Sequence, residues 1–236
     1  MEPKVLVGCP TSDHKAYCLE PYIEGLKKLT YKNKDILIVD NSATDNYMKR
    51  IQTLGIPVIK DEYLRYARDR IVHSRNILRE KTINEEYEYF LSLEQDVIPP
   101  PNIIETLLKA KKQVITGVYY NTYKFFGKEK IRPLIWGPVE GHPDHMQFLT
   151  DEAEKPQIMQ IKASGLGCIL IHVDVLKKIH FSVGDDSEAF DDIYFCKDLE
   201  KNNIPLYTDT TMKCKHLIKG MRWDDIQDAE KHPTSK

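Results

Sequence analysis

The sequence has no long hydrophobic run and no excess of charge of one sign. No stretch of its 236 residues approaches the ~18 consecutive apolar residues that span a bilayer. Its opening residues, MEPKVLVGCP, lack the long apolar region of a signal peptide. Lys and Arg total 34 against 36 Asp and Glu, so no global basic field favours a nucleic acid as partner. We therefore expect a soluble, cytoplasmic protein without a transmembrane segment, with peripheral membrane contact left open.

Several familiar motifs are also missing. The five cysteines are odd in number and form no CxxC pair, which argues against a disulfide framework and a zinc knuckle. We expect Cys9, Cys168 and Cys196 to be small buried hydrophobic residues, because their neighbours are apolar. Neither GxGxxG nor GxxxxGK[ST] occurs, so a dinucleotide fold and a P-loop are not supported. No serine or cysteine lies in a motif that would make it a catalytic nucleophile.

The first half of the chain alternates short apolar runs with helical patterns. The runs are nearly continuous in apolar character and predict strands covered on both faces, at 5–9, 36–40, 57–59, 89–93 and 114–119. The patterns between them predict helices at about 15–29, 45–54, 65–82 and 102–112. Such alternation predicts an α/β fold with a mostly parallel sheet, whose ligands bind beyond the carboxyl ends of the strands.

The second half has a different pattern. Residues 120–162 contain aromatic and Pro/Gly-rich pieces, which predict irregular loops and a small antiparallel portion. Further elements are expected as a strand near 167–172, helices at 173–179 and 191–202, and a strand pair around 205–216. No repeat, low-complexity tract or linker interrupts the chain, so we expect one domain over residues 1–236.

The segment YFLSLEQDVIPPP, residues 89–101, ends a buried strand with two carboxylates, Glu94 and Asp96. An ionised carboxylate is costly to desolvate unless a cation or hydrogen bonds compensate. A divalent cation that also carries phosphate oxygens would do this. The alternative is a strand end at which both carboxylates are solvated.

Acidic residues also lie at the start of an expected turn and at the start of an expected helix. Asp40 ends a buried strand in ILIVDNSATD, where it either forms part of a turn, with Asp45 as a helix N-cap, or accepts a hydrogen bond from a base or ribose. Asp191 and Asp192 begin a helix, where acidic residues commonly cap the positive end. One of the pair can cap while Asp192 faces a cleft as a general base.

Three weaker signals concern a histidine, glycines and arginines. His216 lies in KCKHL, where it is either an ordinary surface residue or the completing ligand of a carboxylate metal site. The loop at residues 164–167, SGLG, contains two glycines, whose lack of side chains would let the backbone approach a ligand closely. The helix at 65–82 carries several arginines, which we expect to form mostly a solvated basic face, with Arg75 directed toward the rim of the sheet.

Read in order, these pieces resemble the family 2 type of nucleotide-sugar glycosyltransferases with the A-type (GT-A) fold. The resemblance spans about residues 4–217 and consists of VLVGCPTS, IVDNSATD, HSRNILRE, EQD with its following proline and helix, ASGLGCILI, FDDIYFC and KCKHL. Glu94 replaces the first Asp of the family's DxD metal motif, and Asp191 replaces the Glu of its ED pair. The segment 120–162 has no motif that aligns with the family.

The resemblance implies a donor site at the carboxyl edge of the sheet. Residues of about 1–120 would form the nucleotide-binding half and about 121–220 the acceptor-side half, followed by a tail at 221–236. The donor would be a UDP- or GDP-sugar. Its binding residues would be Pro10, Thr11, Asp40, Arg75, Glu94 and Gln95, with Asp40 at the base.

The resemblance also implies the catalytic chemistry. Asp96 and His216, with Glu94 near the ribose or the metal, would hold Mn²⁺ or Mg²⁺ beside the diphosphate. Asp192, in its pair with Asp191, would deprotonate the acceptor hydroxyl, so that a single displacement inverts the anomeric centre. The acceptor, a glycan, a lipid or a protein, would contact 120–162 and the segment 185–192. The alternatives are a non-catalytic nucleotide- or glycan-binding module and, more remotely, a nucleotidyltransferase.

Overall fold

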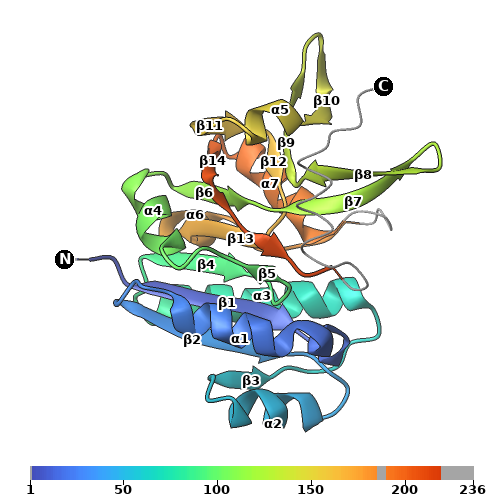
Figure 1. Ribbon diagram of the computed structural model, residues 1–236. Helices are drawn as coiled ribbons and strands as arrows, with labels where there is room; N and C mark the ends of the chain where they lie inside the picture. The colour runs from blue at the N-terminus through green and yellow to red at the C-terminus, as the bar shows by residue number, and fades with distance from the viewer. Residues whose placement is uncertain (1, 185–189, 219–236) are drawn as a thin grey trace.

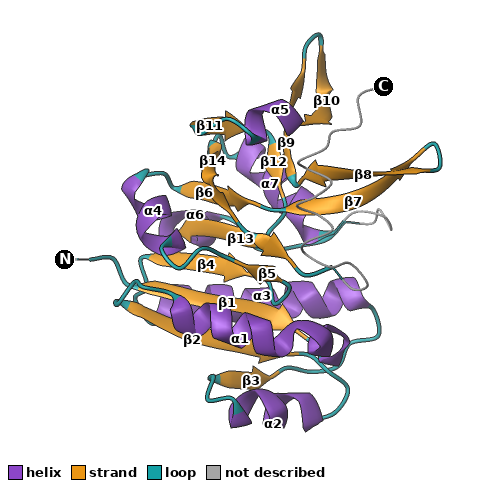
Figure 2. Ribbon diagram, viewed as in Figure 1, coloured by secondary structure: helices purple, strands orange, loops and turns teal. Residues whose placement is uncertain are grey.

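A computed structural model describes residues 2–184 and 190–218, and the expected tail at 221–236 lies outside them. An eight-stranded sheet runs through both halves of the chain in the order β11-β14-β6-β13-β4-β1-β2-β3, with helices on both sides (Figure 1, Figure 2). Its strands are β1 (Val5–Thr11), β2 (Lys34–Asp40), β3 (Val58–Lys60), β4 (Tyr89–Leu93), β6 (Val114–Val118), β11 (Ile158–Ile161), β13 (Cys168–His172) and β14 (Leu206–Lys213). The expected α/β class is confirmed.

The sheet is mixed but mostly parallel. β13 pairs antiparallel with both β4 and β6, and β11 pairs antiparallel with β14, whereas the other pairings are parallel. The antiparallel β13 between β4 and β6 was not expected from the alternating pattern. β1, β2 and β4 are parallel neighbours, so their carboxyl ends lie along one edge of the sheet. The sequence predicted that ligands bind at this edge.

The helices cover the sheet in two layers. Consecutive residues of a strand alternate between faces, so Val5 and Val7 pack in one core while Leu6 packs in the other. The first layer contains α1 (Leu19–Lys28), α2 (Asn46–Thr53) and α4 (Ile103–Lys109); the second contains α3 (Ala67–Asn84), α6 (Val173–Lys178) and α7 (Asp191–Lys201). This two-sided burial explains the continuous apolar runs of the sequence.

Smaller elements complete the second half of the chain. They are the hairpin of β7 (Tyr120–Phe125) and β8 (Lys128–Pro133), the sheet of β9 (Ile135–Val139), β10 (His142–Phe148) and β12 (Ala163–Ser164), and the short helix α5 (Thr150–Ala153). The antiparallel portion expected within 120–162 is therefore present. The expected strand pair at 205–216 is wrong in one respect, because β14 joins the large sheet while β15 (Lys215–His216) pairs with β5 (Val97–Ile98).

Two further sequence expectations are settled by burial. All five cysteines are free and buried, as expected for Cys9, Cys168 and Cys196. The expectation of a mostly solvated basic face on α3 is wrong, because Arg70, Arg75 and Arg79 are all buried. No helix in the described ranges is long and apolar enough to cross a bilayer.

Candidate active site

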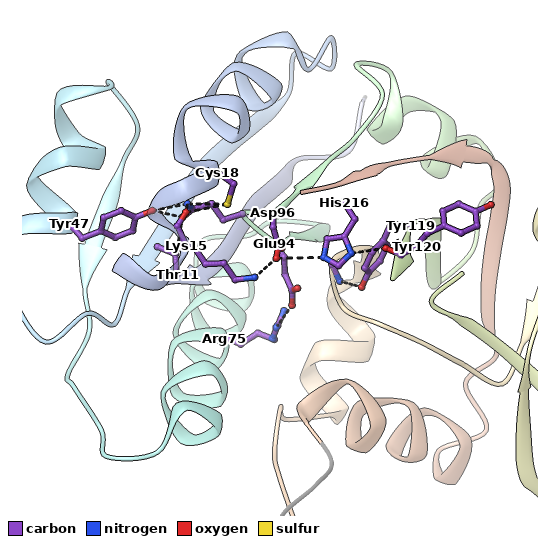
Figure 3. Close-up of polar contacts among 12 residues, drawn as sticks. Thr11, Lys15, Cys18, Tyr47, Arg75, Glu94, Asp96, Tyr119, Tyr120 and His216 are labelled. Carbon is purple, nitrogen blue, oxygen red and sulfur yellow. Dashed lines mark hydrogen bonds and ion pairs between the residues drawn. The ribbon is translucent and has the colours of Figure 1, made fainter. Parts of the chain in front are cut away.

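The turn after β4 brings Asp96 and His216 together. β4 ends at Leu93, and the next two-residue strand, β5, pairs antiparallel with β15 so that Val97 lies opposite His216. The backbone N–H of Leu217 also donates to the carbonyl oxygen of Asp96 at 2.6 Å. As a result, His216 Nε2 lies 3.5 Å from Asp96 Oδ2 (Figure 3).

Asp96 is surrounded by positive charge. Burial alone would raise the pKa of its carboxyl, but hydrogen bonding to His216 and the charges of Lys15 and His216 outweigh burial and lower that pKa to about 2. Burial alone would lower the pKa of His216, but its hydrogen bond to Asp96 and the charge of that carboxylate raise it. His216 Nδ1 lies 2.8 Å from the carbonyl oxygen of Tyr120, which fixes the ring with Nε2 toward Asp96.

Lys15 is a member of this site that sequence reasoning missed. It lies in the 3₁₀ helix η1 (Asp13–Cys18), directly after β1, and its ammonium donates to Asp96 Oδ2 (Figure 3). Burial alone would lower the pKa of Lys15, but the charges of Asp96 and Glu94, together with the hydrogen bond to Asp96, outweigh burial and raise it. The sequence did offer one signal for Lys15. It is a basic residue that closely follows a strand whose end was predicted to lie at the ligand-binding edge.

Asp96 retains one unused oxygen. Oδ1 is buried and has no hydrogen-bond partner in the described part of the chain. A buried carboxylate oxygen of this kind is costly unless something outside the protein contacts it. A carboxylate oxygen suits Mn²⁺ or Mg²⁺, and an imidazole nitrogen is a common ligand of transition metals, so these two residues fit a divalent cation and Mn²⁺ better than Mg²⁺. In the described ranges, no cluster of three or more His, Cys, Asp or Glu side chains could hold an ion by itself.

Glu94 lies beside a buried arginine. Arg75, 1% exposed, donates from Nη2 to Glu94 Oε1 at 3.0 Å, from Nε to Asp191 Oδ2 at 2.7 Å and from Nη1 to the Ser92 hydroxyl at 2.6 Å. Burial would lower the pKa of Arg75, but the charges of Asp191 and Glu94 outweigh it and hold the guanidinium protonated. In this structure Arg75 therefore holds two carboxylates in place, and its expected contact with a nucleotide stays a prediction.

The two acidic residues at the start of α7 lie in different surroundings. Asp191 is buried against Arg75, whereas Phe190 occupies the N-cap position of the helix. Asp192 Oδ1 accepts from the backbone N–H of Ile193 at 2.8 Å. Burial raises the pKa of Asp192 to about 6, and the charges of Asp191 and Glu94 add to the rise. A half-buried carboxyl that titrates near neutrality suits general-base chemistry.

Gln95 connects the loops around the carboxyl edge. The Thr11 hydroxyl donates to Gln95 Oε1, which also accepts from the Tyr47 hydroxyl at 3.0 Å. Gln95 Nε2 donates to the carbonyl oxygen of Lys15 at 2.6 Å. Thr11 and Gln95, both buried, thereby fix the segment that carries Lys15. Pro10 precedes Thr11 in β1 and lies opposite Val39.

Asp40 is the second carboxylate of this edge with a buried oxygen that lacks a hydrogen bond within the described residues. Its Oδ1 accepts from the backbone N–H of Ser42 at 3.0 Å and from the Ser42 hydroxyl. Its Oδ2 is fully buried with no hydrogen-bond partner in the described residues, although Lys60 Nζ lies 3.5 Å away. The loop of Asp40 is held by Asn41, whose amide donates to Ser74 on α3 at 3.0 Å. Asp45 lies at the N-cap of α2 without a side-chain capping bond.

The glycines of SGLG have a structural use. A side-chain carbon at Gly165 would lie 2.1 Å from the Tyr119 hydroxyl, and one at Gly167 would lie 2.6 Å from the same ring. Tyr119 occupies this space, accepts from the Gly167 N–H at 2.8 Å and packs edge-on against His216 at 5.3 Å between ring centroids. The close approach that the sequence suggested for a ligand is thus made by Tyr119.

Comparison with known proteins identifies the fold. No family model and no curated protein matches the sequence. Among solved structures, the mannosyltransferase PcManGT from Pyrobaculum calidifontis, in complex with GDP-Man and Mn²⁺, is 12% identical with a TM-score of 0.62 over 96% of this chain and 60% of its own. GalNAc-T7 with UDP, GalNAc and Mn²⁺ is 11% identical with a TM-score of 0.63 over 93% of this chain and 45% of its own. The chain has a GT-A fold.

Identities this low establish the fold alone. The chain spans less than two thirds of the length of either glycosyltransferase. A third structure, A197 from STIV, is 14% identical with a TM-score of 0.50 over 92% of this chain and 86% of its own. In the GT-A fold of this chain, the edge that carries Thr11, Asp40 and Asp96 is formed by the carboxyl ends of β1, β2 and the turn after β4.

Proposed function

We propose that this protein is a divalent-metal-dependent glycosyltransferase that moves a sugar from a UDP- or GDP-sugar to an acceptor hydroxyl with inversion. The observation that carries the proposal is a pair of buried carboxylate oxygens, Asp40 Oδ2 and Asp96 Oδ1, that have no hydrogen-bond partner among the described residues and lie on the ligand edge of a GT-A fold. A base N–H would satisfy the first and a metal ion the second. The two similar glycosyltransferase structures, which contain UDP or GDP-Man with Mn²⁺, support this assignment.

The residues divide into a donor side and an acceptor side, about 1–120 and 121–220. Asp96 and His216 would hold the metal ion, with donor phosphate oxygens as further ligands. When bound, the metal neutralises charge on the departing nucleoside diphosphate. Pro10, Thr11 and Gln95 would border the nucleotide, and Glu94 would lie near the ribose or the metal.

Asp192 is the proposed general base. Its carboxylate would accept the proton of the acceptor hydroxyl, a step that typically contributes 10²–10⁴-fold to rate. Arg75 would act as a positioning residue, because it holds Asp191 beside Asp192 and Glu94 beside the donor. The segment 120–162 would contact the acceptor, while residues 185–189 of the expected acceptor segment lie outside the described part of the chain.

Calorimetric titration with UDP- and GDP-sugars, with and without Mn²⁺, tests the donor half of the proposal. Binding of one nucleotide class that requires Mn²⁺ is expected, and no binding under any metal condition would refute it. A screen of glycan and lipid acceptors tests transfer. Donor binding without hydrolysis or transfer to any acceptor would instead identify a binding module, and pyrophosphate release from a nucleoside triphosphate would identify a nucleotidyltransferase.

A further inference from the structure

The β7–β8 hairpin extends away from the body of the molecule (Figure 1, Figure 2). Two phenylalanines lie at its tip. Phe126 is 105% exposed and Phe125 is 37% exposed. Phe126 therefore contributes no packing to the part of the chain that the structure describes. A single exposed phenylalanine would be ordinary, but two adjacent ones form an exposed apolar patch, and such patches mark a contact with something outside the chain.

The backbone at the tip is unfavourable for phenylalanine. Phe126 and Gly127 form the two-residue turn between the paired residues Phe125 and Lys128, with φ of 50° and 76°. Both central positions of such a turn require positive φ, for which Asn-Gly is strongly preferred. The other non-glycine residues with positive φ in the described ranges are Glu86, Lys111 and Asn203, all polar. A bulky apolar residue retained in a strained, exposed position suggests a function.

Lysines accompany the aromatic residues on one face of the hairpin. Tyr123 lies opposite Lys130 and Phe125 opposite Lys128, and directly paired residues point to the same side of a hairpin. On the other face, Lys124 forms an ion pair with Glu129 at 4.0 Å. Lys128 and Lys130 are exposed. The tip is therefore locally basic although the chain as a whole has a net charge of -2.

The aromatic face continues toward the candidate active site. The ring of Tyr123 lies 5.0 Å from that of Phe148 between centroids, and Phe148 lies 5.3 Å from Trp136. The hairpin also begins at the candidate active site, because Tyr120 is the first residue of β7 and its carbonyl oxygen lies 2.8 Å from His216 Nδ1. A surface on which the hairpin rests would thus lie on the acceptor side of the molecule.

We propose that the β7–β8 hairpin docks on an anionic lipid surface. Phe125 and Phe126 would enter the boundary between headgroups and acyl chains, while Lys128 and Lys130 pair with acidic headgroups. The combination of a protruding tip, the fully exposed Phe126 beside the partly exposed Phe125, and flanking lysines favours a bilayer over a neutral glycan, which needs no positive charge. Docking depends on the hairpin alone and not on the chemistry assigned to Asp96 and Asp192.

Co-sedimentation of the full chain with phosphatidylcholine vesicles, with and without phosphatidylserine, tests the proposal. Binding is expected with phosphatidylserine only and should weaken as salt is raised. Phe126→Asn should weaken vesicle binding about tenfold, because no aromatic ring would then be buried in the bilayer at this position. Asn suits positive φ, so this variant should melt no lower than the wild type. Lys128→Gln with Lys130→Gln should weaken binding about 25-fold, at about fivefold for each charge.

The matched control is Lys128→Arg with Lys130→Arg, which keeps the charge and should keep the binding. Three results would overturn the proposal: no vesicle binding, equal binding to vesicles without phosphatidylserine, or undiminished binding by Phe126→Asn. Binding to immobilised glycans that Phe126→Asn abolishes, without vesicle binding, would assign the hairpin to an acceptor glycan instead. Nucleotide titration of Phe126→Asn should match the wild type, which separates this test from that of the proposed function.

Discussion

His216 Nε2 lies 3.5 Å from Asp96 Oδ2, while Asp96 Oδ1 is buried without a hydrogen-bond partner among the described residues. The two side chains are far apart in sequence and are joined by the short pairing of β5 with β15. An imidazole fixed by the carbonyl oxygen of Tyr120 and a carboxylate with an oxygen free of hydrogen bonds would form half of the proposed metal site, and donor phosphates would supply further ligands.

Asp192→Asn should abolish transfer while donor binding survives. The amide cannot accept the acceptor's proton, so the transfer rate should fall by about 10²–10⁴-fold. Because the pKa of Asp192 is raised to about 6, wild-type kcat/KM should fall as pH is lowered through about 6. Steady-state rates from pH 5 to 8, with calorimetric nucleotide titration as the control, check both statements. A wild-type rate independent of pH across this range would contradict the role of Asp192.

The same substitution should stabilise the protein at neutral pH. The folded-state pKa of Asp192 lies above its ordinary value of 3.8, so the folded protein binds this proton more tightly than the unfolded chain does. The resulting stability is present in full below about pH 3.8 and is lost as pH rises through about 6. Asp192→Asn should therefore raise the free energy of unfolding at pH 7 by about 2–3 kcal/mol, and by little at pH 4. Urea denaturation at both pH values measures the difference.

Lys15→Met should strengthen binding of Mn²⁺. The ammonium of Lys15 contacts Asp96 Oδ2 and competes with a cation for that carboxylate, so its removal should lower the Mn²⁺ dissociation constant about fivefold, the size of a modest ion pair. Free Mn²⁺ measured by electron paramagnetic resonance gives the value. Lys27→Met, on the exposed side of α1, is the matched control and should leave it unchanged. Weaker Mn²⁺ binding by Lys15→Met would show that Lys15 supports the site instead.

Arg75→Met should destabilise the fold strongly. It leaves the buried Asp191 and the partly buried Glu94 without their cation, which should cost about 3–5 kcal/mol of unfolding free energy. Arg75→Lys should recover only part of the loss, because an ammonium cannot bridge both carboxylates as the planar guanidinium does. Guanidinium chloride denaturation measures each variant. Arg65→Met, at an exposed position, should change stability by less than about 0.5 kcal/mol.

The parts of the fold set by local pattern could be predicted from the sequence. Strand β4 has the expected bounds because its apolar run is followed at once by polar residues and prolines. The shared edge of Thr11, Asp40 and Asp96 followed from the parallel-sheet rule. The antiparallel β13 could not be predicted, since an apolar run carries no information on strand direction.

The contacts between side chains were harder to predict than the position of the ligand-binding edge of the sheet. The arginines of α3 suggested a solvated face because charge usually lies outside, but the buried Arg75 pairs with Glu94, just after β4, and with Asp191 of α7, which is 116 residues away in sequence. Lys15 went unnoticed because its partner Asp96 is likewise distant. The glycines of SGLG suggested a ligand, whereas only the tertiary structure shows that Tyr119 fills the space.

The central claim is that Asp96 holds a metal ion that carries the donor diphosphate. Its most direct test is calorimetric titration of UDP and GDP into wild type and Asp96→Asn, each with and without Mn²⁺. Thermal melting first shows that the variant is folded. The account predicts that Mn²⁺ strengthens binding of one nucleotide to the wild type at least tenfold and leaves its binding to Asp96→Asn unchanged. Equal enhancement by Mn²⁺ in both proteins would contradict it.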